Sequence, residues 1–349
     1  MEGHQQMIFI FYHCCILFFS SVNQLAHSSP TSNSCNPDDK NVLLQIKDHF
    51  HNVYPFSEWN PKSDDCCNYE GVDCHDQGPG LGRINSIFIT QASGVGSLAG
   101  EIPSIIGDLP FLTTIGFSGQ PNLTGSIPPS FTKLTMLAVL DLESNSLSGP
   151  IPDFLGQIKT LRVIQIGSNQ FSGSIPSSLS LLPILSILDL SGNRLTGAIP
   201  ESFGSFTTGL KTLRLQGNNG LSGAIPKSLG KPNLTTLDLS YNKFTGDASF
   251  LFSKDKPLVI LELRQNQLKF NFSKVDLPMS LNYFDIAYNN IYGSLPKRAG
   301  QLHQWIYFNV SFNELCGKIP KGGRLKQFSP SGFSHNKCLC DAPGLPPCK

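Results

Sequence analysis

The chain has 349 residues, 15% of them charged, and a formal net charge of +1. With both signs spread along it, the chain lacks a basic footprint for nucleic acid and an acidic, solvated tail. The length would fit two or three ordinary domains, but a repeat protein grows by adding coils to one core. The number of domains therefore cannot be inferred from the length alone.

A short apolar run stands near the start of the chain. Residues 7–19 read MIFIFYHCCILFF, and small and polar residues follow up to Ser29. This pattern predicts a secretory signal over residues 1–27, with cleavage near Ala26. The run is too short to cross a bilayer, and no later stretch has the roughly 18 consecutive apolar residues of a membrane-spanning helix. We therefore expect a secreted, extracellular protein without a membrane span.

Residues 28–82 are predicted to form an N-terminal, cysteine-rich cap. Asp38 and Asp39 stand where a helix can begin, and Leu43, Ile46 and Phe50 follow with helical spacing. An amphipathic helix with its apolar side on the next segment fits this pattern.

The next part of the chain, residues 83–327, repeats itself about every 24 residues. Each unit approximates L-x-x-L-x-L-x-x-N-x-L-x-G-x-I-P, which is the pattern of leucine-rich repeats. We predict an α/β leucine-rich repeat solenoid, a right-handed curved superhelix with a parallel β-sheet on its concave side. About ten plant-type repeats are expected, beginning near Ile84, Leu112, Leu137, Leu161, Leu185, Leu210, Leu234, Leu258, Leu281 and Trp305.

Two features within the repeats carry structural expectations. Repeats seven and eight lose G-x-I-P, at residues 246–248 and 270–272, so their convex side should differ from the others. Asparagine recurs just after the strand, where a buried amide can satisfy the backbone of the turning chain. The members of this ladder are Asn145, Asn169, Asn193, Asn242, Asn266, Asn289 and Asn313.

Eight cysteines remain after the signal, in two groups of four that flank the repeats. Residues 328–349 form the predicted C-terminal cysteine-rich cap. Even groups in a secreted chain indicate disulfides, which at these places would close the ends of the array. Zinc binding by Cys66, Cys67 and Cys74 is disfavoured, because two separated C-x-x-C pairs are missing. The favoured pairing is sequential: Cys35 with Cys66, Cys67 with Cys74, Cys316 with Cys338 and Cys340 with Cys348.

No set of converging acids, bases or nucleophiles stands out in the sequence. Residues 94–99 match a loose G-x-G-x-x-A pattern, but no βαβ unit surrounds it, and the histidines are scattered. We therefore expect no catalytic residue, no cofactor and no metal, and a protein that acts by binding.

The residue between the two strand leucines should face outward on the concave side. Across repeats one to ten these residues are Phe88, Gly116, Asp141, Gln165, Asp189, Arg214, Asp238, Glu262, Asp285 and Asn309. Five of the ten are acidic, so neighbouring strands, roughly 4.8 Å apart, would carry a discontinuous acidic stripe. Outward neighbours include Glu143, Ser191, Gln216, Ser240, Arg264, Tyr283 and Tyr307.

Two interpretations of this stripe stay open. The acids can simply belong to the common L-D-L-S repeat and keep the face soluble. Alternatively, the face binds a basic or polar protein surface and steers its approach. Ice binding would need a flat array of small hydroxyl or Asn side chains, and the mixed charges argue against it. The predicted partner-binding residues are Asp141, Glu143, Gln165, Asp189, Ser191, Arg214, Gln216, Asp238, Ser240, Glu262, Arg264 and Asp285.

Four N-x-S/T sequons predict N-glycosylation at Asn122, Asn233, Asn271 and Asn309, as expected of an extracellular glycoprotein. Asn309 is an outward strand residue between Phe308 and Val310. A glycan there would stand at the C-terminal margin of the concave face and limit what can dock.

The chain resembles the plant polygalacturonase-inhibiting proteins, from about Cys35 to Cys348. The matching segments include CNPDDK with LLQIK in the N-terminal cap, the Cys66–Cys67 pair, DFLGQIKTL from residue 153 and GDASFLF from residue 246. The last repeat and cap add NVSFN from residue 309, LCG from residue 315 and CLC from residue 338.

The resemblance implies an inhibitor and not an enzyme, which acts in plant defence in the cell wall, the apoplast. Its concave face would bind fungal or insect endopolygalacturonase and prevent pectin hydrolysis, with cell-wall pectin as a further ligand. Asp238 keeps an acid that is common in the family, whereas Gln165, Arg214, Glu262 and Arg264 depart from it. Because some relatives lack inhibition, the alternative is a non-inhibitory recognition protein in developmental or defence signalling.

Overall fold

The computed structural model describes residues 35–349, apart from residues 52, 64, 91–96, 207–208, 342–343 and 349. They belong to one compact unit, Ser34–Lys349. The predicted secretory signal lies outside the described residues. Within the described part, no helix combines the length and the apolar character that a membrane span requires.

The N-terminal cap contains the predicted helix, α2 (Pro37–His49). It begins after Asn36, whose side chain accepts hydrogen bonds from the backbone N–H of Asp38 (2.9 Å) and Asp39 (3.3 Å). These bonds satisfy two of the donors that a helix start leaves free. The buried Asp39 carboxylate accepts two bonds from the Arg83 guanidinium, at 2.7 and 2.9 Å, and so ties the helix to the first repeat. Shorter cap elements are η1 (Phe56–Glu58), η2 (Cys66–Asn68), β1 (Val72–Cys74) and η3 (Gly78–Gly80).

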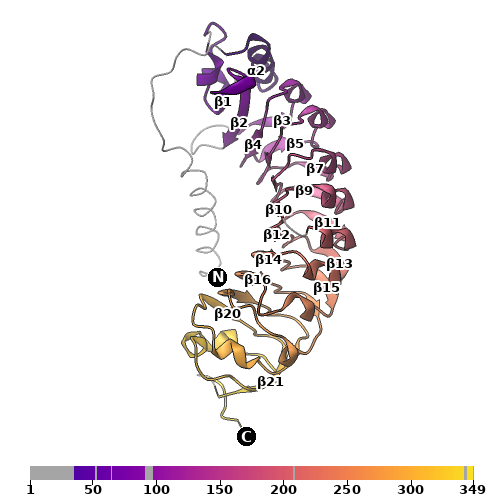
Figure 1. Cartoon of the computed structure of the whole chain (residues 1–349), viewed down its shortest axis with the longest axis vertical. Helices are drawn as coiled ribbons and strands as arrows, with labels where there is room; N and C mark the ends of the chain where they lie inside the picture. Colours follow the sequence, from indigo (N-terminus) through magenta and orange to yellow (C-terminus); the bar gives the residue numbers. More distant parts are fainter. Residues whose placement is uncertain are drawn as a thin grey trace. The chain divides into compact units, whose positions relative to one another are not determined.

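The concave side of the array is an eleven-stranded sheet (Figure 1). β1 pairs antiparallel with β2, and every later pair is parallel, so one parallel strand comes from each of the ten predicted repeats. The parallel strands are β2 (Ile84–Thr90), β4 (Thr114–Ser118), β6 (Val139–Asp141), β8 (Val163–Gln165), β10 (Ile187–Asp189), β12 (Thr212–Arg214), β14 (Thr236–Asp238), β16 (Ile260–Glu262), β18 (Tyr283–Asp285) and β20 (Tyr307–Asn309).

The asparagine ladder is present behind this sheet. The Asn193 Nδ2 donates to the carbonyls of Ile166 (3.0 Å) and Leu190 (3.2 Å), and its Oδ1 accepts from the Phe171 N–H (3.0 Å). Each such side chain therefore satisfies backbone groups of its own coil and of the preceding one. Two further members were not among the predicted ladder residues: Asn218, which fits the repeat motif, and Asn336 in the C-terminal cap.

A second, parallel sheet lies on the other side of the ladder, which the sequence pattern did not predict (Figure 1). Its six strands are β7 (Ser148–Pro150), β9 (Gln170–Ser174), β11 (Arg194–Gly197), β13 (Gly220–Ala224), β15 (Lys243–Gly246) and β17 (Gln267–Leu268). Smaller sheets continue this side at both ends: β3 (Ala99–Glu101) with β5 (Asn122–Thr124), and β19 (Tyr292–Gly293) with β21 (Glu314–Lys318) and β22 (Cys338–Cys340).

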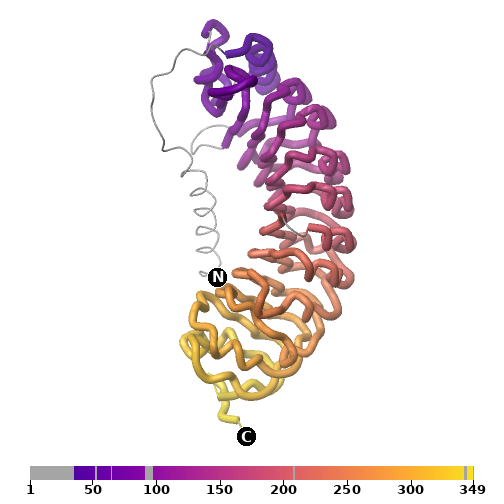
Figure 2. The backbone as a smooth tube through the Cα atoms, viewed as in Figure 1, coloured from indigo at the N-terminus to yellow at the C-terminus, as the bar shows by residue number. Residues whose placement is uncertain are grey.

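The convex side consists of short 3₁₀ helices, one for each coil, and Figure 2 shows the coils stacked on one another. Glycines allow this close stacking, since a Cβ on Gly156 would lie 2.3 Å from the Ser178 carbonyl oxygen of the next coil. The helices are η4 (Ser104–Asp108), η5 (Pro129–Lys133), η6 (Asp153–Gln157), η7 (Ser177–Leu181), η8 (Glu201–Ser205), η9 (Lys227–Gly230), η10 (Ser249–Leu251), η11 (Phe272–Lys274), η12 (Lys297–Gly300) and η13 (Leu325–Gln327). A further short helix, η14 (Pro330–Gly332), lies in the C-terminal cap beside the end of β20.

The convex side of repeats seven and eight differs, as their missing G-x-I-P predicted. Their helices η10 and η11 have three residues each, whereas η6 to η8 have five. Phenylalanines fill the space: the Phe252, Phe270 and Phe272 rings are neighbours, and the Phe272 ring stacks on that of Phe284 at 5.8 Å.

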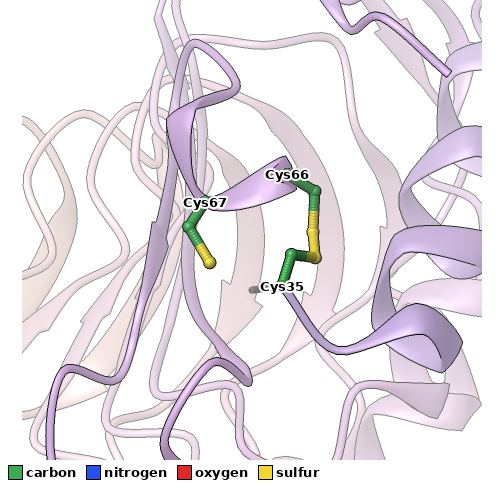
Figure 3. A group of neighbouring side chains, drawn as sticks. All are labelled: Cys35, Cys66 and Cys67. Atoms are coloured by element: carbon green, nitrogen blue, oxygen red, sulfur yellow. A yellow bond between two sulfur atoms is a disulfide. The ribbon is translucent and has the colours of Figure 1, made fainter. Parts of the chain in front are cut away.

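Both ends carry disulfides in the sequential pairing that the sequence favoured: Cys35–Cys66, Cys67–Cys74, Cys316–Cys338 and Cys340–Cys348. Figure 3 shows the Cys35–Cys66 bond with Cys67 beside it. The C-terminal cap imitates a further coil, because the Gly332 and Ser334 carbonyls accept from the Val310 (2.8 Å) and Phe312 (3.0 Å) N–H groups that follow β20. The cap boundary at residue 328 stays a prediction, since ladder geometry continues to Asn336.

Candidate protein-binding face

The concave sheet presents three columns of outward side chains. In each short strand the middle residue is buried, as for Leu140 and Leu188, and its neighbours point outward. The register pairs Asp189 with Gln165 on one side and Arg214 on the other, so the residues predicted to line up across repeats do so. We call Phe88, Gly116, Asp141, Gln165, Asp189, Arg214, Asp238, Glu262, Asp285 and Asn309 the central column.

A second column lies two residues earlier in each strand, and only its members Tyr283 and Tyr307 were predicted from the sequence. Its side chains are mostly β-branched or aromatic and half-buried. Such residues are common in any strand, so no single repeat indicated a surface feature. The side chains form a continuous stripe only because the repeats align them. We call this set the apolar column: Thr114, Val139, Val163, Ile187, Thr212, Thr236, Ile260, Tyr283 and Tyr307.

A third column lies two residues after the central one. It contains the five further predicted contact residues, so all twelve predicted partner-binding side chains share one face. We call this set the downstream column: Glu143, Gly167, Ser191, Gln216, Ser240, Arg264, Ala287 and Ser311.

The aspartates of the central column have a structural task. One carboxylate oxygen accepts the backbone N–H two residues later, and this contact holds the turn after the strand. The bonds are 3.0 Å from Ser191 N–H to Asp189, 2.9 Å from Ser240 N–H to Asp238 and 2.8 Å from Ala287 N–H to Asp285. The first interpretation of the acids, as part of the repeat itself, therefore has a physical basis at these positions.

The carboxyl groups crowd together, and their charge is smaller than the sequence count suggests. Burial, followed by the charges of Asp189 and Asp141, raises the pKa of Glu143 to about 7. Burial raises the pKa of Asp238 to about 6, and burial with the Asp238 and Asp285 charges raises the pKa of Glu262 to about 9. At mildly acidic pH these groups hold protons. The expected acidic stripe is thus a row of carboxyl groups that is only partly negative.

Two arginines offset part of the remaining charge. The Arg214 guanidinium lies 3.5 Å from the Asp189 carboxylate, and that of Arg264 lies 3.5 Å from the Asp285 carboxylate. The second Asp285 oxygen is a hub, because it also accepts from the Tyr307 hydroxyl and the Asn309 amide, each at 3.2 Å. The face is therefore a mixed-charge network of carboxyl groups and arginines.

Side chains of the downstream column contain buried polar atoms that make no hydrogen bond within the described part of the chain. They include the Gln216 Oε1 and the Arg264 Nε, in repeats six and eight. Buried polar groups are normally paired, so such atoms are expected where water or a partner completes the surface. This stretch is the part of the face best prepared to accept polar contacts.

The cysteines near the N-terminus do not form a metal site. Cys35, Cys66 and Cys67 lie close enough to suggest one (Figure 3), but Cys35 is bonded to Cys66, and Cys67 to Cys74. The zinc alternative is therefore wrong, because a thiolate ligand must be free of a disulfide.

The four predicted glycosylation sites differ in exposure. Asn122 and Asn233 are exposed, and the half-buried Asn271 caps η11 through its Oδ1. Asn309 is 8% exposed, and its amide nitrogen donates to Asp285 and to the Tyr307 hydroxyl (3.2 Å each). A glycan would be attached to this same nitrogen.

Comparison with known proteins agrees with this architecture. A leucine rich repeat N-terminal domain model matches residues 36–75, and leucine rich repeat models match residues 135–195, 185–206 and 230–248. A polygalacturonase inhibitor of Pyrus communis is 53% identical over 334 residues, which cover 95% of this chain and 96% of that protein. The chain belongs to the polygalacturonase-inhibitor family.

Other relatives of this inhibitor-family chain carry different names on the same scaffold. The leucine-rich repeat protein FLOR 1 of Arabidopsis thaliana is 49% identical, over 96% of this chain and 98% of its own. Among solved structures, a plant ice-binding protein is 41% identical with a TM-score of 0.84, over 90% of this chain and 99% of its own. Family membership therefore specifies the scaffold more closely than the ligand.

Proposed function

We propose that this protein is secreted into the plant cell wall, binds fungal or insect endopolygalacturonase through its concave sheet and blocks pectin hydrolysis in defence. The observation that carries the proposal is the three-column face, whose central column extends over ten strands, on a chain 53% identical to a polygalacturonase inhibitor over nearly its whole length.

The dimensions and chemistry of the face suit a folded protein partner. Ten strands spaced about 4.8 Å apart extend over roughly 45 Å, enough for the ~800 Å² that each partner buries in a standard interface. The apolar column can supply the dry centre of such an interface, and the central and downstream columns its polar contacts. Inhibition then needs no chemistry from this chain, because a protein held over a substrate cleft excludes a polymer.

We place specificity at the central positions that depart from aspartate. Gln165, Arg214 and Glu262 stand where other repeats use a carboxylate to hold the turn. Changing them alters the surface with little effect on the repeat. By contrast, reversing the charge of Asp189 or Asp238 would disturb the turn itself and so could not distinguish binding from folding.

The test mixes the purified secreted protein with a panel of fungal and insect endopolygalacturonases and measures both binding and residual pectin hydrolysis. Val163→Arg adds a charged side chain to the apolar column and should abolish both binding and inhibition. Thr196→Arg, on β11 of the second sheet, is the matched control and should leave them unchanged. Absence of binding to every panel member refutes the function, and full binding by Val163→Arg refutes the concave face as its site.

Pectin binding is supported by an uneven charge distribution. Residues 211–349 contain 18 Lys and Arg against 8 Asp and Glu, whereas residues 35–210 contain 8 against 16. A polyuronate is a polyanion, so the C-terminal half should attract it, and salt should weaken the attraction. Lys297→Glu with Lys321→Glu should shorten retention on immobilised polygalacturonate, whereas Lys62→Glu in the N-terminal cap should not. Equal retention of the wild type, the double variant and Lys62→Glu would contradict the assignment of pectin binding to the C-terminal half.

Ice binding is a second candidate, favoured by one feature away from the concave face. In six successive repeats the second side of the coil presents a small hydroxyl residue just before the turn glycine, and strand spacing makes the row regular. The sequence argument against ice binding considered only the concave column. Thermal hysteresis that Thr196→Lys removes would support this function, and its absence in the wild type would exclude it. The row is Thr124, Ser148, Ser172, Thr196, Ser222 and Thr245.

A further inference from the structure

Bulky side chains occupy a strained backbone position in the C-terminal repeats. The residue before each ladder asparagine has a positive φ, which favours glycine or a small polar residue. Repeats three to six use Ser144, Ser168, Gly192 and Gly217 there. From repeat seven onward the position is taken by Tyr241, Gln265, Tyr288, Phe312 and His335, with φ between 53° and 57°.

With Arg264 between Tyr241 and Tyr288, these side chains form a continuous row across five successive coils. The Tyr288 and Phe312 rings stack at 4.1 Å and 11°, and the Phe312 and His335 rings at 4.0 Å and 5°. The Arg264 guanidinium covers the other face of the row, 4.9 Å from the Tyr288 ring and 5.9 Å from that of Tyr241. We call Tyr241, Arg264, Tyr288, Phe312 and His335 the aromatic margin.

The fold does not need bulky residues at these positions. Ser144 and Ser168 make the same turn with a similar φ in earlier repeats. A tyrosine or phenylalanine with positive φ is strained, and such strain persists mostly where a side chain serves a function. Stacking recovers part of the cost, but it leaves the ring edges outward, and Tyr288 is 39% exposed.

The aromatic margin borders the concave face. Arg264 belongs both to the margin and to the downstream column, and its Nε is among the buried atoms that lack a hydrogen-bond partner in the described residues. Tyrosine and arginine are also the residues that most often dominate binding energy in protein interfaces. A partner seated on the concave sheet of repeats eight to ten would reach this margin.

We propose that the aromatic margin anchors the enzyme that the concave face binds, an inference that rests on the function proposed above. The matching segment of the partner lays an apolar side chain against the ring edges of Tyr288 and Phe312. It also offers a carbonyl or carboxylate oxygen to the Arg264 guanidinium, whose side chain is 22% exposed. The anchor therefore lies in repeats eight to ten, towards the C-terminal end of the sheet.

The experiment compares Tyr288→Ser with Phe312→Ser, singly and together, against wild type. The chosen serine restores the residue that Ser144 and Ser168 already provide at this turn. The double variant should bind a wild-type-bound endopolygalacturonase at least tenfold more weakly, with an unchanged or higher Tm. Tyr292→Ser is the matched control, because Tyr292 is 41% exposed but lies in β19, and it should change affinity less than twofold.

Three results would count against the proposal in distinguishable ways. If wild type binds no enzyme of the panel, the proposed function fails and the anchor with it. If wild type and the double variant bind equally, only the anchor is refuted. If the double variant loses Tm and affinity together, and Tyr292→Ser behaves likewise, the row is structural and the anchor is again refuted.

Discussion

The asparagine ladder allows a prediction with a control built into the chain. Asn193 and Asn242 occupy the same position of repeats five and seven, and they are 5% and 8% exposed. The Nδ2 of each donates to backbone carbonyls of its own coil and of the preceding one. Only Asn193 also accepts, from the Phe171 N–H, whereas the Asn242 Oδ1 is buried without a partner among the described residues.

Alanine at either position leaves buried carbonyls unpaired, and at Asn193 it also leaves the Phe171 N–H unpaired. Each buried group that loses its partner costs about 1–3 kcal/mol. We therefore expect the free energy of unfolding to fall by roughly 3–5 kcal/mol for Asn193→Ala. The loss for Asn242→Ala should be about 1–2 kcal/mol smaller, because one bond fewer is broken.

Urea unfolding with intact disulfides measures this difference. Far-UV circular dichroism reports on the whole array, and fluorescence reports on its two ends through the buried Trp59 and Trp305. Coincident transitions would justify a two-state comparison. Equal losses for the two variants, or a larger loss for Asn242→Ala, would refute this prediction. They would show that the hydrogen bond from the Phe171 N–H to the Asn193 Oδ1 does not contribute to stability.

Three further outcomes are expected. Arg83→Ala leaves the buried Asp39 carboxylate without its ion pair and should cost about 3–5 kcal/mol in urea unfolding, part of which Asp39→Asn in the same chain recovers. Glu262 has its pKa raised from 4.5 to about 9, so the folded state holds a proton that the unfolded state releases. The contribution of Glu262 to stability should therefore be greatest below pH 4.5 and fall as pH rises towards 9, and Glu262→Gln should gain about 2–3 kcal/mol on wild type between pH 5 and 7; parallel pH profiles would contradict this. Mass spectrometry of the secreted protein should find Asn122 glycosylated and Asn309 unmodified, because the Asn309 amide is bonded within the face; a glycan on Asn309 would show that this network opens.

Much of the candidate face could be predicted because a solenoid converts sequence period into spatial alignment. Residues one repeat apart become neighbours on adjacent strands, so the central column from Phe88 to Asn309 could be read directly from the sequence. The apolar column was missed except at Tyr283 and Tyr307, although the same rule would have given all of it. Val163 and Ile187 are residue types that are common in any strand. They indicate a binding surface only once it is known that their side chains point outward.

The structural role of the acids was less accessible. The i+2 bond of Asp189 depends on the turn after the strand, and the protonation of Glu262 depends on burial beside carboxylates from other coils. A sequence count treats each acid as an independent negative charge. Solvent exposure and neighbours decide whether that charge exists, and both are properties of the stacked coils.

The sequence by itself determined the repeat, the number of coils, the two cysteine-rich ends and the family. It could do so because every coil repeats the same local pattern and contacts mainly its neighbours. Only the tertiary structure revealed the second sheet, the raised pKa values of the carboxyl groups on the concave face and the aromatic margin. These depend on which side chains from different coils share a buried space, and the ring stack of Tyr288, Phe312 and His335 exists only once three coils are superposed.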